Sequence, residues 1–341
     1  MAFNIIWFVL WGLLWAVYFM LDGFVLGTGM LHAVMPKNEA EKRVLIKSVG
    51  PIWNGNEVWL ITAGGATFAA FPTTYALMFS YLYTALLLLL FSLIIRGVSL
   101  EFRGKQSGER WTRTWDAGII LGGTLPSLLF GVAFGNIFSG LPMDAAGYHG
   151  GLLQLLNPYG LLTGLLFVVM FLVHGSLYVS LKTDGELQKR SLALAGKLWI
   201  GLLVVAVVFL GATAFATKLY DNFLRAPGFL VVPLLAIAAL LGAKLFIARN
   251  KPGVAFAASC VTVVTVVATG VIGLFPDLIP SSLDSAYSLT IYNSSSSQYT
   301  LSIMTIVAAI FVPIVILCKI WAYRQFRARI TMREVMGGDA Y

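Results

Sequence analysis

The sequence predicts an all-α integral membrane protein whose helices cross the bilayer nine times. Hydrophobic residues make up 59% of the 341 residues, and charged residues make up only 11%. The stretches 58–95 and 285–318 contain no Lys, Arg, Asp or Glu, and about 20 apolar residues suffice to cross the bilayer core. Of the 23 Lys and Arg residues, 21, Arg96 among them, are assigned to alternate connecting segments or to the span ends beside them when nine spans are drawn. The net charge of +8 therefore reflects membrane sidedness and does not indicate nucleic-acid binding.

The expected spans follow from the apolar runs and from the basic residues between them. They cover 5–31, 51–71, 74–99, 115–138, 158–181, 192–216, 227–248, 253–275 and 300–323. Basic residues stay on the cytoplasmic side during insertion, so we expect the C-terminus in the cytoplasm and the N-terminus outside. Eight or ten spans would place at least one basic segment on the opposite side of the membrane.

An internal repeat relates the first expected span to the fifth. Residues 10–23 read LWGLLWAVYFMLDG and residues 162–175 read LTGLLFVVMFLVHG, with seven of fourteen positions identical. An offset of four spans makes the two segments parallel. We therefore expect residues 1–341 to form a single polytopic membrane domain with a pseudo-repeat, 1–140 and 158–275. This gives two parallel-related four-helix bundles plus a peripheral helix at 300–323. Shared lipid-facing composition is the alternative explanation of the match.

Glycine pairs at a spacing of four residues recur along the expected spans. They are Gly23/Gly27, Gly118/Gly122, Gly131/Gly135 and Gly160/Gly164. Small residues at this spacing let two helix backbones approach closely. The pairs predict helix packing and require no cofactor.

Asp22, Glu57 and His174 are ionisable side chains expected within the membrane. Counted from the cytoplasmic ends of their spans, all three lie at a depth of roughly 9–14 Å. Buried ionisable groups in a membrane are costly and are candidates for function. At one depth, they form a candidate proton relay from the cytoplasm. The alternative is that each side chain is a hydrogen-bonded centre that fixes helix packing.

The segment 50–60, GPIWNGNEVWL, is the densest polar cluster in the expected spans. Asn54 and Glu57 join the candidate proton pathway, and Trp53, Asn56 and Trp59 are candidates for contact with another subunit or for a gas route. An interfacial tryptophan belt explains the two Trp residues but not the polar residues between them. We expect Asp116, at the mouth of the fourth span, to be an interfacial residue.

No metal site is expected in this chain. His32 and His149 are assigned to loops, which leaves His174 as the only histidine within the expected spans. His and Met are usual axial ligands of haem, but no methionine has a spacing that pairs it with His174. We also find no nucleotide-binding loop or catalytic triad pattern, so no independent active site is expected.

Four stretches carry a resemblance to a known family. They read DGF followed by GTGML from position 22, GPIWNGNEVW from 50, HG at 174 ahead of KT at 182, and PSSL from 280 leading to SSQYTL from 296. On these stretches the chain resembles subunit II of the bd-type quinol oxidases, and the resemblance covers the whole chain. It implies a respiratory complex in the bacterial cytoplasmic membrane that reduces O2 to water with electrons from quinol.

The resemblance also implies partners and cofactors. A larger subunit I is expected to hold two b haems and one d haem, and this chain to hold none, although a quinone is compatible with the family. A small single-span subunit is a further expected partner, as is the lipid membrane. Subunit II is then a scaffold and a wall of the cytoplasmic proton pathway. The rival interpretations are a secondary transporter with parallel helical repeats and a purely structural subunit.

One departure from the family pattern affects the proton pathway. Many members carry Asp at the position of Asn54 and Gln at the position of Glu57. An offset of three residues keeps a side chain on nearly the same face of a helix. Because Asn does not exchange a proton, Glu57 replaces position 54 as the expected carboxylate.

Overall fold

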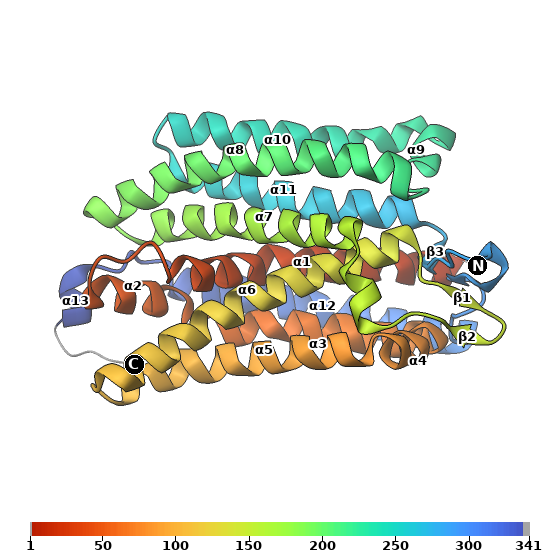
Figure 1. Cartoon of the computed structure of the whole chain (residues 1–341), viewed down its shortest axis with the longest axis horizontal. Helices are drawn as coiled ribbons and strands as arrows, with labels where there is room; N and C mark the ends of the chain where they lie inside the picture. Colours follow the sequence, from red (N-terminus) through yellow and green to blue (C-terminus); the bar gives the residue numbers. More distant parts are fainter. Residues whose placement is uncertain (1, 337–341) are drawn as a thin grey trace.

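The structure is a computed structural model that describes residues 2–336 (Figure 1). Its long helices are α1 (Ala2–Leu31), α3 (Trp53–Ala70), α5 (Tyr83–Phe102), α6 (Glu109–Ser139), α7 (Pro158–Lys182), α8 (Gly185–Ala216), α10 (Val231–Ala248), α11 (Pro252–Leu274) and α12 (Gln298–Gln325). Shorter helices are α2 (Glu39–Val49), α4 (Pro72–Tyr81), α9 (Asp221–Arg225) and α13 (Met332–Met336). Two small hairpins pair β1 (Met143–Asp144) with β2 (Gly147–Tyr148) and β3 (Asp277–Ile279) with β4 (Leu289–Thr290).

Within residues 2–336, eight helices are long and apolar enough to cross a membrane. The expected span 51–71 coincides with α3, which is 18 residues long and is not one of the eight. Its polar residues, Asn54, Asn56 and Glu57 among them, lower its mean hydropathy. The integral membrane, all-helical prediction is confirmed, whereas the ninth crossing stays a prediction.

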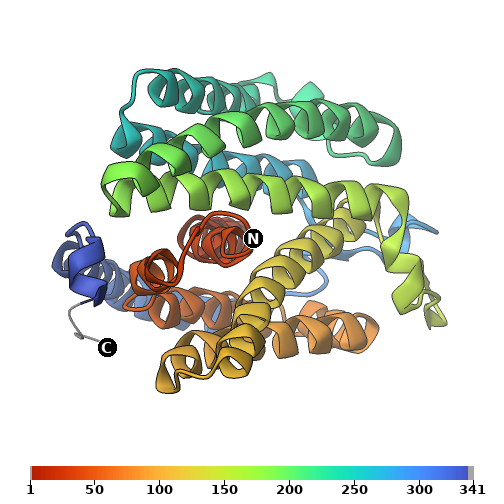
Figure 2. The ribbon, with the colours of Figure 1, turned by 60° about the vertical axis from the view of Figure 1, so that its left-hand side comes forward.

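The long helices lie side by side in two groups (Figures 1 and 2). One group contains α7, α8, α10 and α11, and the other contains α1, α3, α5 and α6. Helix α7 joins the groups because it packs against both α1 and α6. Helix α12 lies at the outside and contacts α1. The groups contain the helices expected for the two bundles, and the repeat relation between them stays a prediction.

The apolar core lies where α1, α6 and α7 meet. Phe19 and Phe171 have no exposed surface, and the Phe19 ring packs edge-on against Phe130, Phe134 and Phe167 at centroid distances of 5.1–5.5 Å. Aromatic pairs favour this edge-to-face geometry. The core therefore fixes α1 between the two groups of helices.

Glycine pairs allow the closest helix crossings, as the sequence predicts. A Cβ on Gly27 would lie 1.9 Å from the Phe171 carbonyl oxygen, and one on Gly175 would lie 2.6 Å from the Gly27 carbonyl carbon. Gly131 packs against Gly164 in the same way. A Cβ on Gly131 would lie 2.6 Å from the Gly164 Cα. Any larger residue would push these helices apart. These contacts bring α7 against α1 and α6.

The segments that carry most of the basic residues lie at one end of the helices (Figure 1). Helices α2 and α13 lie at this end, and the two hairpins and α9 lie at the other. We refer to the end that contains α2 and α13 as the basic end. One residue departs from the pattern. Arg96, assigned by the sequence to a connecting segment, lies inside α5 with 1% of its surface exposed. That assignment is wrong, because Arg96 is paired with acidic side chains from two other helices.

Candidate functional site

Arg96 lies between the two carboxylates that the sequence singles out. Its Nη1 donates to Asp22 Oδ2 at 2.8 Å, and its Nη2 donates to Glu57 Oε1 at 2.5 Å. The three side chains come from α1, α3 and α5, so one guanidinium joins three helices. The Tyr18 hydroxyl donates a further hydrogen bond to Asp22 Oδ2 at 3.2 Å. We call Asp22, Glu57 and Arg96 the acid cluster.

The charges of the acid cluster do not balance. Two carboxylates share one guanidinium, which leaves a net charge of −1 when both are ionised. Asp22 is fully buried, whereas the Glu57 side chain is 23% exposed. Among residues 2–336, Asp22 Oδ1 has no hydrogen-bond partner. An uncompensated buried charge is costly, and a proton on one carboxylate removes it. The cluster is therefore suited to hold one exchangeable proton, with Glu57 as its accessible member.

Small residues bring the helices of the acid cluster together. A Cβ on Gly122 of α6 would lie 2.5 Å from Arg96 Cβ, so α6 packs directly on the backbone that carries the guanidinium. A Cβ on Gly97 would lie 2.8 Å from the indole ring of Trp53. Gly118 and Gly122, expected to serve packing, therefore hold α6 against α5.

The segment 53–59 forms the start of α3 and connects it to two other helices. Asn56 is fully buried, donates to the Leu21 carbonyl at 2.7 Å and accepts a hydrogen bond from the Tyr323 hydroxyl at 2.9 Å. Lys319 of α12 donates to the Gly55 carbonyl. A side chain at position 55 would collide with the Lys319 ammonium. These contacts explain why the helix tolerates glycine here, at a cost of about 1 kcal/mol relative to Ala.

The remaining candidates from this segment lie in different surroundings. Asn54 is exposed, so it is accessible but outside the acid cluster. The Trp53 indole donates to Glu101 at 3.2 Å. Trp59 is buried and lines an apolar groove of about 770 Å³ between α1, α3 and α12. A role for these residues in subunit contact or in a gas route stays a prediction.

His174 lies apart from the acid cluster in the hydrogen-bond network. Its Nε2 donates to the Met20 carbonyl at 2.9 Å, and its Nδ1 lies 2.7 Å from the Ser259 hydroxyl. The ring stacks on Phe256 at a centroid distance of 4.9 Å. Both ring nitrogens are therefore engaged within the protein. The structure brings Asp22 and Glu57 together, and it places His174 in the contact between α1, α7 and α11.

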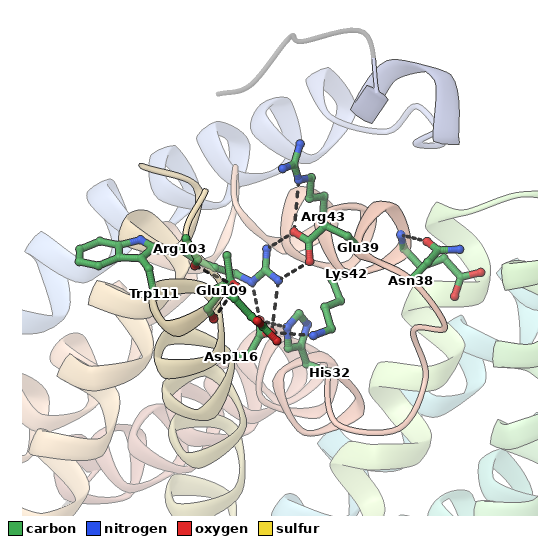
Figure 3. A network of polar contacts seen from close by, with 12 residues as sticks. His32, Asn38, Glu39, Lys42, Arg43, Arg103, Glu109, Trp111 and Asp116 are labelled. Atoms are coloured by element: carbon green, nitrogen blue, oxygen red, sulfur yellow. Dashed lines mark hydrogen bonds and ion pairs between the residues drawn. The ribbon is translucent and has the colours of Figure 1, made fainter. Parts of the chain in front are cut away.

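A second polar network lies closer to the basic end and is drawn in Figure 3. Asp116 accepts from His32 Nε2 at 2.6 Å, from Lys42 Nζ at 2.7 Å and from Arg103. Arg103 in turn donates to both carboxylate oxygens of Glu39 at 2.8 and 2.9 Å. These hydrogen bonds hold the pKa of the Glu39 carboxyl below its usual value. We call His32, Glu39, Lys42, Arg103 and Asp116 the basic-end network.

The pairing of Arg96 and the basic-end network both depend on residues that are far apart in the sequence. Asp116 was expected to be an ordinary interfacial residue and His32 a loop residue, yet His32 is 3% exposed and paired. The partners come from α2, from α6 and from the residues that directly follow α1 and α5, and they share no local motif. The one available signal was that Arg96 falls inside the expected span 74–99, where a charge requires a partner.

The comparison with protein families decides the assignment. The family model described as cytochrome bd terminal oxidase subunit II matches residues 3–326. The chain belongs to this family. The assignment confirms the resemblance found in the sequence and replaces the secondary-transporter alternative. It makes the chain a subunit of a terminal oxidase.

Individual relatives agree with the family assignment. Cytochrome bd ubiquinol oxidase subunit 2 of Bacillus subtilis strain 168 is 38% identical, over 97% of this chain and 98% of that protein. Cytochrome bd-I ubiquinol oxidase subunit 2 of Escherichia coli strain K12 is 36% identical, over 97% and 96%. A solved structure of the bd oxidase from Geobacillus thermodenitrificans shares the fold, with a TM-score of 0.77 over 96% of this chain and 18% identity.

The family implies haem on the partner subunit, and neither His174 nor His149 of this chain is arranged as a haem ligand. Within residues 2–336, no group of three or more His, Cys, Asp or Glu side chains could hold a metal ion. Both nitrogens of His174 are already engaged, and His149 is a surface residue that pairs with Asp144 at 2.7 Å. We therefore assign no haem chemistry to this chain.

Proposed function

We propose that this chain is the non-haem subunit of a bd-type quinol oxidase and forms part of its cytoplasmic proton pathway. Both bacterial relatives carry ubiquinol oxidase in their names, which supports quinol as the electron donor and O2 as the acceptor. The proposed partner is subunit I with two b haems and one d haem, and a small single-span subunit completes the complex. The basic end then faces the cytoplasm, with the N-terminus outside.

The observation that supports the proton role is that Arg96 pairs with both Asp22 and Glu57. Glu57 takes up a proton because its carboxylate is the more exposed of the two. Arg96 holds Glu57 and Asp22 in one hydrogen-bonded unit, which keeps the second carboxylate in reach of the first. Asp22 accepts the proton on Oδ1, the oxygen that has no hydrogen-bond partner among residues 2–336. The excess negative charge of the cluster attracts the next proton from the basic end.

His174 and Asn54 have smaller roles in this proposal. His174 has no hydrogen bond to either carboxylate, and its contacts support helix packing. Asn54 lies one helical turn before Glu57 on the exposed side of α3, where it lines the approach to the cluster. Proton exchange is assigned to Glu57 and Asp22 only.

The test uses the assembled oxidase with Glu57→Gln or Asp22→Asn. Each variant keeps a hydrogen-bond acceptor for Arg96 and removes the exchangeable proton. We expect quinol oxidase turnover and proton uptake to fall at least about tenfold, in line with the usual contribution of a positioned acid or base. Glu101→Gln is the matched control, because Glu101 is an exposed carboxylate at the same end of α5.

Haem content from the visible spectrum reports whether each variant assembles. Wild-type turnover and proton uptake in both variants, with normal haem content, would contradict the proton role. The chain would then be a purely structural subunit.

A further inference from the structure

A small cavity separates the acid cluster from the basic-end network. Its volume is about 10 Å³, which is about the space that one buried water requires. It lies between α1, α2, α5 and α6. Its lining residues are Val25, Thr28, Gly29, His32, Leu45, Ile46, Val49, Arg96, Leu100 and Ile119. Arg96 and His32 therefore both line this cavity, one from each network.

Both of these side chains present an unpaired nitrogen. Among the residues described, Arg96 Nε and His32 Nδ1 are buried and have no hydrogen-bond partner. The other nitrogens of Arg96 are directed to Asp22 and Glu57, and His32 Nε2 is directed to Asp116. An unpaired polar group in a protein interior costs roughly 1–3 kcal/mol. Two such groups at one cavity indicate a bound polar molecule.

We propose that the cavity binds one ordered water that joins the two networks. The water accepts a hydrogen bond from Arg96 Nε and donates one to His32 Nδ1, which is an acceptor because Nε2 donates to Asp116. Its second hydrogen is donated to the hydroxyl oxygen of Thr28, whose own hydrogen is donated to the Phe24 carbonyl at 2.7 Å. Three hydrogen bonds are typical of a buried water.

The water makes His32 a positioning residue for the acid cluster. Asp116 orients the imidazole, the imidazole orients the water, and the water holds the Nε side of the guanidinium. The opposite side of the same guanidinium holds Asp22 and Glu57. The two networks become one hydrogen-bonded system from Glu39 to Glu57. The effect of this link on turnover rests on the proposed function, whereas the water site itself does not.

A second cavity provides a control within the same chain. It has the same volume of about 10 Å³ and lies between α7, α8, α10 and α11. Its polar lining groups, His174, Trp199, Ser259 and Thr262, all have hydrogen-bond partners within the protein. No group there needs a water, so this cavity is expected to be dry.

The first test is a density map of the assembled oxidase at a resolution that shows ordered waters. We expect density within about 3.2 Å of both Arg96 Nε and His32 Nδ1 and no density in the control cavity. A map that shows buried waters elsewhere in the subunit but none between these two nitrogens would overturn the proposal.

The second test fills each cavity with one methyl group. Val49→Ile fills the proposed water site, and Val263→Ile fills the control cavity. We expect Val49→Ile to lower the apparent Tm of the oxidase by about 3 °C, because displacing the water leaves two buried nitrogens unpaired. Val263→Ile is expected to leave Tm unchanged or raised. A Tm of Val49→Ile at or above that of Val263→Ile would overturn the water site.

Turnover separates this proposal from the proposed function. If the acid cluster conducts protons, Val49→Ile lowers turnover several-fold relative to Val263→Ile, because Arg96 loses its orienting partner. A lowered Tm with unchanged turnover supports the water site and contradicts the proton role of the cluster.

Discussion

The acid cluster and the basic-end network combine carboxylates with cations in different proportions. In the acid cluster, two carboxylates share one guanidinium, and Asp22 Oδ1 has no hydrogen-bond partner among residues 2–336. In the basic-end network, the two carboxylates are matched by two cations, and Asp116 also accepts from the imidazole of His32. A carboxylate in excess over its cations favours proton binding, whereas a cation for each carboxylate favours the ionised form. The comparison therefore separates a site that exchanges protons from one that fastens helices.

Their positions fit these different roles. Asp22 and Arg96 are buried within the helices, with Glu57 partly open to the outside. The basic-end network joins α2, through side-chain bonds, to Arg103 just after α5 and to Asp116 of α6 (Figure 3). The hydrogen bonds and ion pairs of the basic-end network hold α2, α6 and the end of α5 together. It holds the acid cluster in place without competing for its proton.

The largest effect is expected from removing the cation of the acid cluster. Arg96→Met removes the cation that is ion-paired with both carboxylates inside the helices, which costs about 3–5 kcal/mol. We expect little assembled oxidase, measured as haem content per milligram of membrane protein. Arg96→Met with Asp22→Asn removes one of the stranded charges and is expected to recover part of the yield. Normal yield of Arg96→Met alone would contradict the charge argument.

A smaller loss of stability is expected in the basic-end network. Asp116→Asn leaves Arg103 and Lys42 without their shared carboxylate, which costs roughly 2–3 kcal/mol. The apparent Tm falls, but turnover per assembled complex stays at the wild-type value, because Asp116 does not carry a proton and the amide oxygen of the substituted side chain can still accept the hydrogen bond of His32 Nε2. A drop in turnover equal to that of Glu57→Gln would remove the distinction between the two networks.

A smaller effect is expected when the accessible carboxylate of the acid cluster is moved from position 57 to position 54, one helical turn earlier on α3. Asn54 precedes Glu57 by three residues on α3 and is exposed. In Asn54→Asp with Glu57→Gln, the acid cluster regains an accessible carboxylate on nearly the same helix face. We expect turnover to recover several-fold relative to Glu57→Gln alone. Recovery no greater than that of Asn54→Ser with Glu57→Gln would show that position 54 is not connected to the cluster.

The smallest effect is a pH dependence at the basic end. Arg103 lowers the pKa of the Glu39 carboxyl from its usual value of 4.5. The stabilisation from this pair is present above pH 4.5 and is lost as the pH falls through the lowered pKa. Glu39→Gln is expected to flatten the acid limb of Tm against pH. Glu109→Gln, in an exposed pair with Arg113, is the control. Identical curves for wild type and Glu39→Gln would contradict a role for the pair.

The sequence predicted the helical membrane fold, the glycine crossings and the meeting of Asp22 with Glu57. These depend on apolar length, small-residue spacing and helix depth, which are local properties. It did not predict the position of Arg96, because counting basic residues assigned it to a connecting segment. It also did not predict the partners of Asp116, since His32, Lys42 and Arg103 come together only through the packing of separate helices. His174 bonds to Ser259 and Met20 and does not join the acid cluster.

The most direct test of the proton role is time-resolved proton uptake by the oxidase in vesicles after a single pulse of O2. Glu57→Gln, Asp116→Asn and wild type are compared at equal haem content. We predict that uptake slows at least about tenfold in Glu57→Gln and stays at the wild-type rate in Asp116→Asn. Equal rates in all three, or a slowing confined to Asp116→Asn, would contradict the assignment of proton exchange to the acid cluster.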